Sequence, residues 1–183
     1  MGSGHEVETK VLDIDPREVR NKLEKLGAEK ILETRLAVDW YWTKGTKEGQ
    51  EPWFLRIRSG SDGAHEVTWK AKSDILGTAR KHQEINLKLE NPEKLAQIFL
   101  EIGLERYAHQ EKDRVSYKYK EWHFDIDQYP EMPAYLEIEG RDENHVLEAI
   151  KLLGLAGNKT WAEGERTLIQ KVYGLDWYQM KFS

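Results

Sequence analysis

Charged residues alternate with apolar residues in several short segments of this chain, and their side chains are the ones best suited to chemistry. Successive side chains point to opposite faces of a β-strand, so each segment would place its charges on one face. Acidic residues occur in the outer segments and basic residues in the inner ones. The segments are residues 5–10, 55–58, 68–72 and 136–139. If their charged faces converge, one cavity would hold carboxylates suited to hard divalent cations beside cations suited to phosphates.

The sorting of these charges by sign argues for a binding site. A single alternating strand usually marks a solvent face, but here like charges recur at every second position on several strands. Like charges packed together cost free energy unless a ligand of opposite sign compensates them. The acidic candidates are Glu6, Glu8, Glu137 and Glu139, and the basic candidates are Arg56, Arg58, Lys70 and Lys72.

Composition narrows the protein class and the kind of metal site. The chain has 183 residues with no Ser- or Pro-rich linker, which predicts one domain over residues 5–183, with residues 1–4 as an expression remnant. It has no cysteine, and its six histidines show no paired metal-ligand spacing, so any metal must be held by oxygen. The net charge of −5 argues against a nucleic-acid partner. The sequence has no apolar run long enough to span a membrane, so we expect a cytoplasmic protein.

Two segments repeat the same helix signals. Asp15-Pro16 and Asn91-Pro92 each combine an N-cap residue with a first-turn proline, and an apolar stripe follows each until a glycine. The match extends outward at a constant offset of 76 residues, which places Glu8 on Glu84 and Tyr41 on Tyr117. We therefore expect two similar halves. Further helices are predicted at residues 143–153 and 161–173.

The strand pattern predicts an α+β fold with a closed barrel. Eight strands are expected, at residues 5–10, 36–43, 53–59, 64–72, 81–89, 113–120, 122–128 and 134–139. The amphipathic helices need an apolar sheet face, so the charged strand faces must point away from them, into a closed eight-stranded antiparallel tunnel. We expect most of the seven tryptophans in the core beneath the helices rather than in a base-stacking platform.

A known family shares this order of motifs. The chain has Glu6-x-Glu8-x-Lys10 at its start, then the Arg56 and Arg58 pair, the Lys70 and Lys72 strand, and later charges on further strands. Those later residues are Glu84, Arg114, Asp125, Asp127, Glu137 and Glu139. In register over nearly the whole chain, these motifs resemble the CYTH superfamily of triphosphate tunnel metalloenzymes. The resemblance implies an eight-stranded antiparallel tunnel, which agrees with the barrel inferred from the strands.

The resemblance and the charges together imply roles for these residues. Cleavage of a triphosphate loads negative charge onto bridging oxygens, so positioning and electrostatics dominate its catalysis. The cations that would clamp phosphates are Arg56, Arg58, Lys70, Lys72 and Arg114. The carboxylates that would hold Mg²⁺ or Mn²⁺ are Glu6, Glu8, Glu137 and Glu139. Asp125, Asp127 and Glu84 are either further ligands or salt-bridge partners of the basic strands. Lys10 and Lys72 are the candidate catalytic lysines.

Three functions fit this set. The first is hydrolysis of tripolyphosphate or a nucleoside triphosphate. The second is a class IV adenylyl cyclase, which also needs a purine pocket that no motif reveals. The third is a catalytically inactive protein that binds polyphosphate or nucleotide. The intact acidic set argues against this third function. Residues 159–164 depart from the Ser-Tyr element found at one tunnel mouth in comparable members, which leaves the substrate open. Pairing is frequent in the family, so a homodimer is a further expectation.

Overall fold

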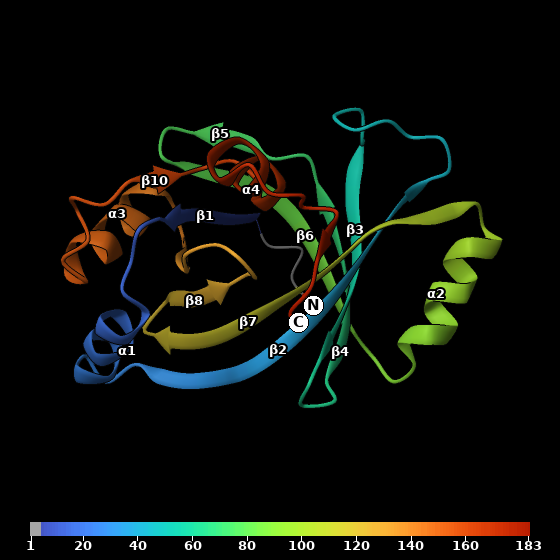
Figure 1. Ribbon diagram of the computed structural model, residues 1–183. Helices are drawn as coiled ribbons and strands as arrows, with labels where there is room; N and C mark the ends of the chain where they lie inside the picture. Colours follow the sequence, from blue (N-terminus) through green and yellow to red (C-terminus); the bar gives the residue numbers. More distant parts are fainter. Residues whose placement is uncertain (1–4) are drawn as a thin grey trace.

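The computed structural model describes residues 5–183. Residues 1–4, which are the expected expression remnant, lie outside the described part, as do the side chains of His5 and Glu6. Figure 1 shows one twisted sheet with helices outside it. The helices are α1 (Pro16–Lys25), α2 (Pro92–Glu101), α3 (Glu143–Leu152) and α4 (Glu165–Tyr173). The strands are β1 (His5–Val11), β2 (Glu29–Thr43), β3 (Trp53–Gly60), β4 (His65–Ala71), β5 (Asp74–Leu76), β6 (Ala79–Leu89), β7 (Leu104–Tyr119), β8 (Trp122–Gln128), β9 (Tyr135–Gly140), β10 (Thr160–Trp161) and β11 (Gln179–Met180).

Eight of the strands close into an antiparallel ring, which confirms the predicted tunnel. The order is β1, β9, β8, β7, β2, β3, β4 and β6, and β6 pairs back to β1. The ring is uneven, because β2 and β7 run for 15 and 16 residues whereas β9 has only 6. Closure removes the free strand edges and leaves an interior that side chains or a small ligand can fill.

The two predicted halves are visible in how β2 and β7 pair. Helices α1 and α2 have the same length and the same device, a capping Asp15 or Asn91 followed by proline. Residues that match at the offset of 76 pair crosswise between the long strands, Lys30 with Tyr117 and Tyr41 with Arg106. Such crossed pairing places an approximate two-fold axis between β2 and β7.

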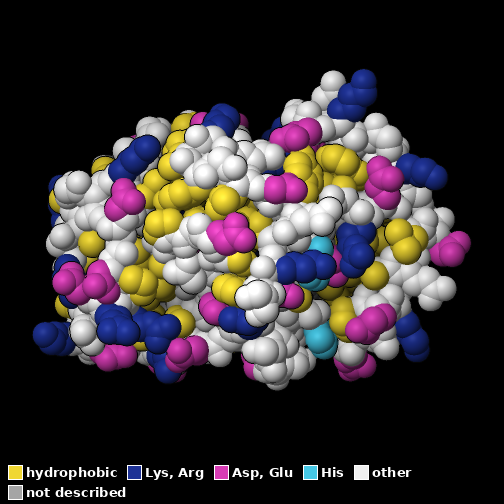
Figure 2. Space-filling view, viewed as in Figure 1, with side chains coloured by type: hydrophobic (Ala, Val, Ile, Leu, Met, Phe, Trp, Pro, Cys, Tyr) yellow, Lys and Arg dark blue, Asp and Glu magenta, His cyan; other side chains and the backbone are white. Residues whose placement is uncertain are grey.

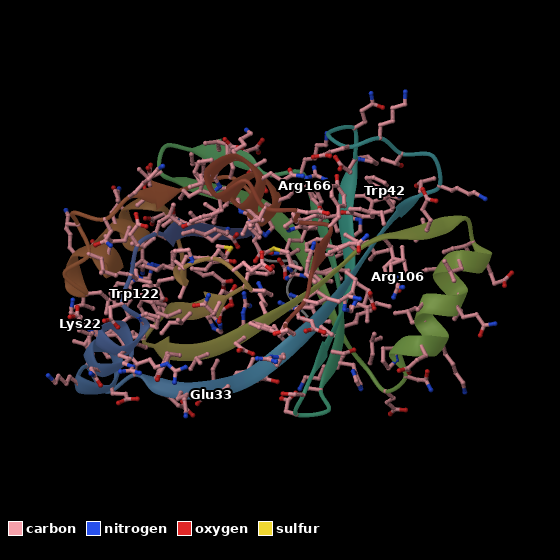
Figure 3. The ribbon with its side chains drawn as sticks, viewed as in Figure 1. Lys22, Glu33, Trp42, Arg106, Trp122 and Arg166 are labelled. Atoms are coloured by element: carbon pink, nitrogen blue, oxygen red, sulfur yellow. The ribbon has the colours of Figure 1, made fainter. Side chains whose placement is uncertain are left out.

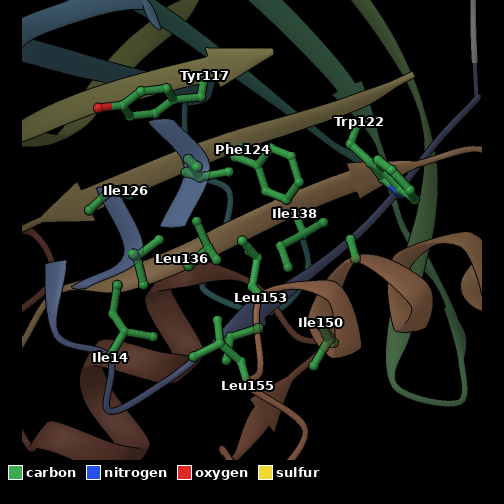
Figure 4. Packing of buried hydrophobic residues seen from close by; sticks show 14 of the residues in the cluster. Ile14, Tyr117, Trp122, Phe124, Ile126, Leu136, Ile138, Ile150, Leu153 and Leu155 are labelled. Atoms are coloured by element: carbon green, nitrogen blue, oxygen red, sulfur yellow. The ribbon is translucent and has the colours of Figure 1, made fainter. Parts of the chain in front are cut away.

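The outer face of β1, β8 and β9 packs against α1 and α3. Phe124, Leu136 and Ile138 are fully buried there (Figure 4). Alternation along the same strands turns Glu8, Asp125 and Glu137 into the tunnel, as the sequence predicted. The outer face of β3, β4 and β6 has less cover, since the cluster around Phe99 of α2 includes Ile57, Val67 and Leu89, whereas Ile85 and Leu87 are exposed.

The structure corrects several element boundaries. Strand β2 begins at Glu29 rather than at residue 36, and β7 begins at Leu104 rather than at residue 113. Each missed stretch pairs with the predicted part of the other strand, since residues 29–35 lie opposite 113–118 and residues 104–112 lie opposite 36–43. Both stretches are rich in polar residues, so their alternation showed no clear apolar face. Helix α4 begins at Glu165 rather than at residue 161, because Thr160 and Trp161 pair with β1 as β10.

The tryptophan prediction was wrong for most of these residues. Only Trp40, Trp122 and Trp177 are buried, and Trp40 and Trp177 border a cavity instead of lying in the large core beneath α1 and α3. No helix in the described residues is long and apolar enough to cross a membrane.

Candidate functional site

Three carboxylates from two adjacent strands converge inside the tunnel. Glu8 lies on β1, and Glu137 and Glu139 lie on β9 directly beside it. Each offers an oxygen within 4.8 Å of the other two. Glu8 Oε2 is buried without a hydrogen-bond partner among the described residues, so it has an acceptor to spare. Three carboxylates with an unused oxygen fit a hard divalent cation, which takes oxygen ligands.

Cations surround this acidic cluster and hold Glu8 ionised. Arg80 Nε donates to Glu8 Oε1 at 2.7 Å, and Lys10 Nζ lies 3.6 Å from Glu8 and 2.7 Å from Glu137 Oε2. Burial opposes ionisation of Glu8, but the charges of Arg80, Lys70 and Lys10 outweigh it and keep the pKa of Glu8 well below its usual range. Glu8 is therefore a carboxylate rather than a carboxylic acid at neutral pH.

Arg114 anchors a second group of charges on β7 and β8. Its Nε lies 2.6 Å from Asp127 Oδ1, and one terminal nitrogen lies 2.6 Å from Asp127 Oδ2. Its other terminal nitrogen lies 2.5 Å from Asp125 Oδ2. The Asp127 contact is the bidentate geometry typical of arginine. Burial raises the pKa of Asp125, but Arg114 reverses this and lowers it overall. Arg114 thus has its donors occupied by carboxylates.

The basic strands place their charges across the tunnel from the acidic cluster. Lys70 forms an ion pair with Glu84 and contacts His82 Nε2 at 3.2 Å. Arg58 pairs with Glu66 on β4. Arg56 is buried, and its Nε has no hydrogen-bond partner among the described residues. Arg56 is therefore the buried basic residue with a donor left over for a ligand.

The basic strands border two cavities. The first has a volume of about 310 Å³ and is bordered by Arg56, Lys70, Lys72, Arg80 and Glu137. The second has about 410 Å³ and is bordered by Arg58, Arg114 and Lys88 among others. Arg56 and Arg58 lie two residues apart on β3, so both side chains point to the tunnel face. Arg56 borders the first cavity, whereas Arg58 borders the second. Lys72 follows the end of β4 and is exposed at the rim of the first cavity.

Helix α4 adds charges to the first cavity. Glu165, its first residue, accepts from Lys112 Nζ at 2.6 Å and from the hydroxyls of Tyr129 and Tyr135 at 2.9 Å each. Arg166 pairs with Glu51, which precedes β3. Burial opposes ionisation of Glu165, but Lys112 and Lys10 outweigh it and lower its pKa. The helix start is thereby fixed against the tunnel wall.

The structure brings together most of the residues that the sequence singled out. Glu8, Glu137 and Glu139 form the acidic cluster with Lys10 paired to it, whereas the side chain of Glu6 lies outside the described residues. Arg56, Lys70 and Lys72 share a cavity with Glu137, and Arg58 and Arg114 border the other one. Asp125, Asp127 and Glu84 are ion-pair partners of Arg114 and Lys70.

Sequence reasoning missed four charged residues at the site. Arg80 was left out because it stands alone at the start of β6, although its pairing opposite Glu8 follows from ring closure. Lys112 lay outside the strand expected at residues 113–120. Glu165 and Arg166 were assigned to a helix without a function. A signal that could have found Arg80 is its alternation with Glu84, since both fall on one face of β6.

Comparisons with known proteins agree with this fold. The CYTH domain model matches residues 4–165. A *Methanocaldococcus jannaschii* protein named "Putative adenylate cyclase" is 34% identical over 138 residues, which cover 73% of this chain and 75% of that protein.

Solved structures extend the comparison to the fold. An X-ray structure of a *Vibrio parahaemolyticus* protein described as a "putative adenylate cyclase" has a TM-score of 0.76 at 14% identity, covering 92% of this chain and 99% of that chain. A *Hippeastrum* "putative adenylyl cyclase", described as having a dominant triphosphatase activity, has a TM-score of 0.63 at 14% identity, covering 93% and 95%. Family match, ring topology and charged interior agree, and the chain belongs to the CYTH domain family.

Proposed function

We propose that this protein is a divalent-metal-dependent enzyme that binds a triphosphate in its tunnel and hydrolyses it. The observation that supports this most is the opposition of charges across one cavity. The cluster of Glu8, Glu137 and Glu139 lies across from Arg56 and Lys70. An anion with several charges and a cation between it and the carboxylates would neutralise both sides.

The residues divide the work according to their partners. Glu8, Glu137 and Glu139 would hold Mg²⁺ or Mn²⁺, which supplies charge neutralisation at phosphate oxygens. Arg56, with its unused donor, and Lys70 would bind phosphate oxygens. Positioning and electrostatic stabilisation then lower the barrier to attack by water.

The lysines have different roles in this proposal. Lys10 is fully buried with its ammonium group held by Glu137 and Glu8, so it orients these carboxylates. Lys72 is exposed at the rim of the cavity, where it would attract an incoming anion. Arg58 and Arg114 border the second cavity and would contribute to the field inside the tunnel rather than to the first phosphate contacts.

Adenylyl cyclase activity is the second candidate, and the name of the 34% identical relative favours it. Cyclisation uses the same phosphate clamp, but the ribose hydroxyl attacks and pyrophosphate leaves. The *Hippeastrum* protein, described by a dominant triphosphatase activity, favours hydrolysis instead.

Product analysis separates these activities. The protein would be incubated with Mg²⁺ or Mn²⁺ and either tripolyphosphate or ATP, and the products separated by ion chromatography and nucleotide HPLC. We expect orthophosphate, lost in a Glu8→Gln, Glu137→Gln variant and kept in Glu121→Gln, whose carboxylate pairs with Arg141 at the surface. Cyclic AMP with equal pyrophosphate would establish the cyclase, and metal-dependent binding without products would leave a silent binder.

A further inference from the structure

Helix α2 presents an exposed apolar stripe. The Ile102 N–H donates to the carbonyl of Ile98 at 3.0 Å, so the two isoleucines lie one turn apart on the same flank of the helix. Their side chains are 67% and 54% exposed, whereas Phe99 on the adjoining face is buried against β2 and β3. Hydrophobic side chains lie at the surface among acidic and basic ones at the end of the molecule where α2 lies (Figure 2).

The internal repeat shows what the same stripe does in the other half of the chain. At the offset of 76 residues, Ile98 corresponds to Lys22 of α1, and Ile102 corresponds to Leu26. Lys22 Nζ donates to the carbonyl of Leu153, the C-cap of α3, at 2.8 Å. Leu26 packs against the core that α1 and α3 share. Figure 3 shows Lys22 on the side of α1 that faces α3. On α1 this stripe is therefore a contact with another helix.

The half of the molecule that contains α2 lacks a counterpart of α3. Within the described residues α2 is followed directly by β7, and α1, α3 and α4 all lie away from it (Figure 1). Its stripe is also more apolar, since an isoleucine replaces Lys22. Single exposed apolar residues are ordinary on protein surfaces. Two of them in a stripe whose counterpart packs against a helix indicate that a partner covers this flank.

The charges beside the stripe fit a second copy of the same helix. Lys94 lies one turn before Ile98, and Glu101 is the last residue of α2. Both are exposed, and neither forms an ion pair with another described residue. If two copies of α2 pack antiparallel about a two-fold axis beside Ile98, Lys94 of each copy lies next to Glu101 of the other. The flank is thus complementary to itself in charge, with the apolar stripe at its centre.

We propose that α2 mediates a homodimer, in which Ile98 and Ile102 of one copy pack against the same stripe of a second copy. One helix of ten residues offers less area than the roughly 1,200–2,000 Å² that stable interfaces bury. The dimer is therefore weak, with a dissociation constant on the order of 10–100 μM. No residue of α2 borders either cavity, so each copy keeps a complete tunnel site.

Sedimentation equilibrium of the whole chain tests the proposal, over protein concentrations from about 2 to about 500 μM. Ile98→Lys places two like charges at the two-fold axis and should weaken dimerisation more than about tenfold. Leu100→Lys is the matched control, because Leu100 is 55% exposed on the same helix but lies on the opposite flank from Ile98. It should change the dissociation constant by less than about twofold. Circular dichroism would confirm that both variants fold.

An exchange of charges tests the antiparallel orientation. Lys94→Glu or Glu101→Lys alone would bring like charges together across the axis and should weaken dimerisation about twofold to fivefold. The double variant Lys94→Glu, Glu101→Lys restores opposite charges and should return the dissociation constant to within about twofold of the wild type. Each single change places the charge that a helix favours at that end, so a weaker helix would not explain the loss of dimer.

Three results would overturn the proposal. The first is a wild type that stays monomeric at about 500 μM. The second is equal weakening by Ile98→Lys and Leu100→Lys, and the third is a double charge variant that associates no better than the single ones. Monomeric Ile98→Lys should still cleave a triphosphate, because α2 borders neither cavity. The homodimer and the proposed function can therefore fail independently.

Discussion

The two sides of the tunnel differ in both charge and cover. The side made by β1, β8 and β9 carries Glu8, Asp125, Asp127 and Glu137 inside, and α1 and α3 bury its outer face. The side made by β3, β4 and β6 carries mostly cations inside, and its outer face is only partly covered, by α2. Ile85 and Leu87 on β6 are 47% and 59% exposed.

The difference matches what each side has to bind. Ligands of a small cation must keep their oxygens at fixed short distances, so strands pinned by a packed core suit them. Phosphates are larger, and arginine and lysine reach them on long side chains that tolerate small shifts of the strand. The packed side would keep the metal-binding oxygens at fixed distances, and the less covered side would adjust its cations to the phosphates.

The largest effect should come from removing cover on the acidic side. Phe124→Ala deletes a fully buried ring and should cost about 3–5 kcal/mol of unfolding free energy. Leu87→Ala on the opposite side should cost no more than about 0.5 kcal/mol, since its side chain is mostly exposed. Urea unfolding of both variants measures the contrast.

A loss at Leu87 comparable to that at Phe124 would contradict the comparison. It would mean that the β6 face is covered in solution, as a homodimer through this face would require. Sedimentation of the wild type would then show whether a second copy of the chain covers this face.

The basic side should respond in catalysis more than in stability. Arg56→Met removes the buried guanidinium with the unused donor and should lower kcat about 100-fold to 1000-fold, similar to loss of one oxyanion donor. Arg106→Met is the matched control, because Arg106 is exposed and pairs with Asp39 at the surface. Equal rates in the two variants, measured by orthophosphate release, would place the phosphates elsewhere.

Acid should weaken the acidic side first. Arg114 depresses the pKa of Asp125, and a depressed pKa means stability that is present above the unfolded pKa of about 4 and is lost as pH falls below it. We expect the free energy of unfolding to fall progressively as the pH drops below about 5, and Asp125→Asn to remove on the order of 1–3 kcal/mol of that fall. An unchanged slope in Asp125→Asn would show that other carboxylates control the acid transition.

The smallest effect should come from a charge pair outside the tunnel. Arg35 and Asp113 make a bidentate pair between β2 and β7, but both side chains are nearly half exposed. Solvent screens such pairs, so Asp113→Asn should cost less than about 1 kcal/mol. Asp127→Asn, which leaves buried Arg114 and Lys112 short of a partner, should cost more in the same unfolding experiment.

Much of this architecture could be predicted from local sequence signals. The α1 and α2 caps, the charged alternation of β1 and β9, and the family motifs identified the tunnel and its acidic cluster. Arg80 could not be predicted, because its importance comes from ring closure opposite Glu8, a contact between residues 72 positions apart. Lys112 and Trp177 also act through distant partners, and single-chain periodicity does not reveal such partners.

The crossed pairing of β2 with β7 has a consequence for how the chain folds. Strands β2 and β7 join the two halves, so Lys30 must pair with Tyr117 before the ring can close. Contacts between residues so distant in sequence slow folding, because the entropy of closing a long loop is lost before they form. Either half alone would show unpaired strand edges, so a fragment ending before β7 should aggregate where the whole chain folds.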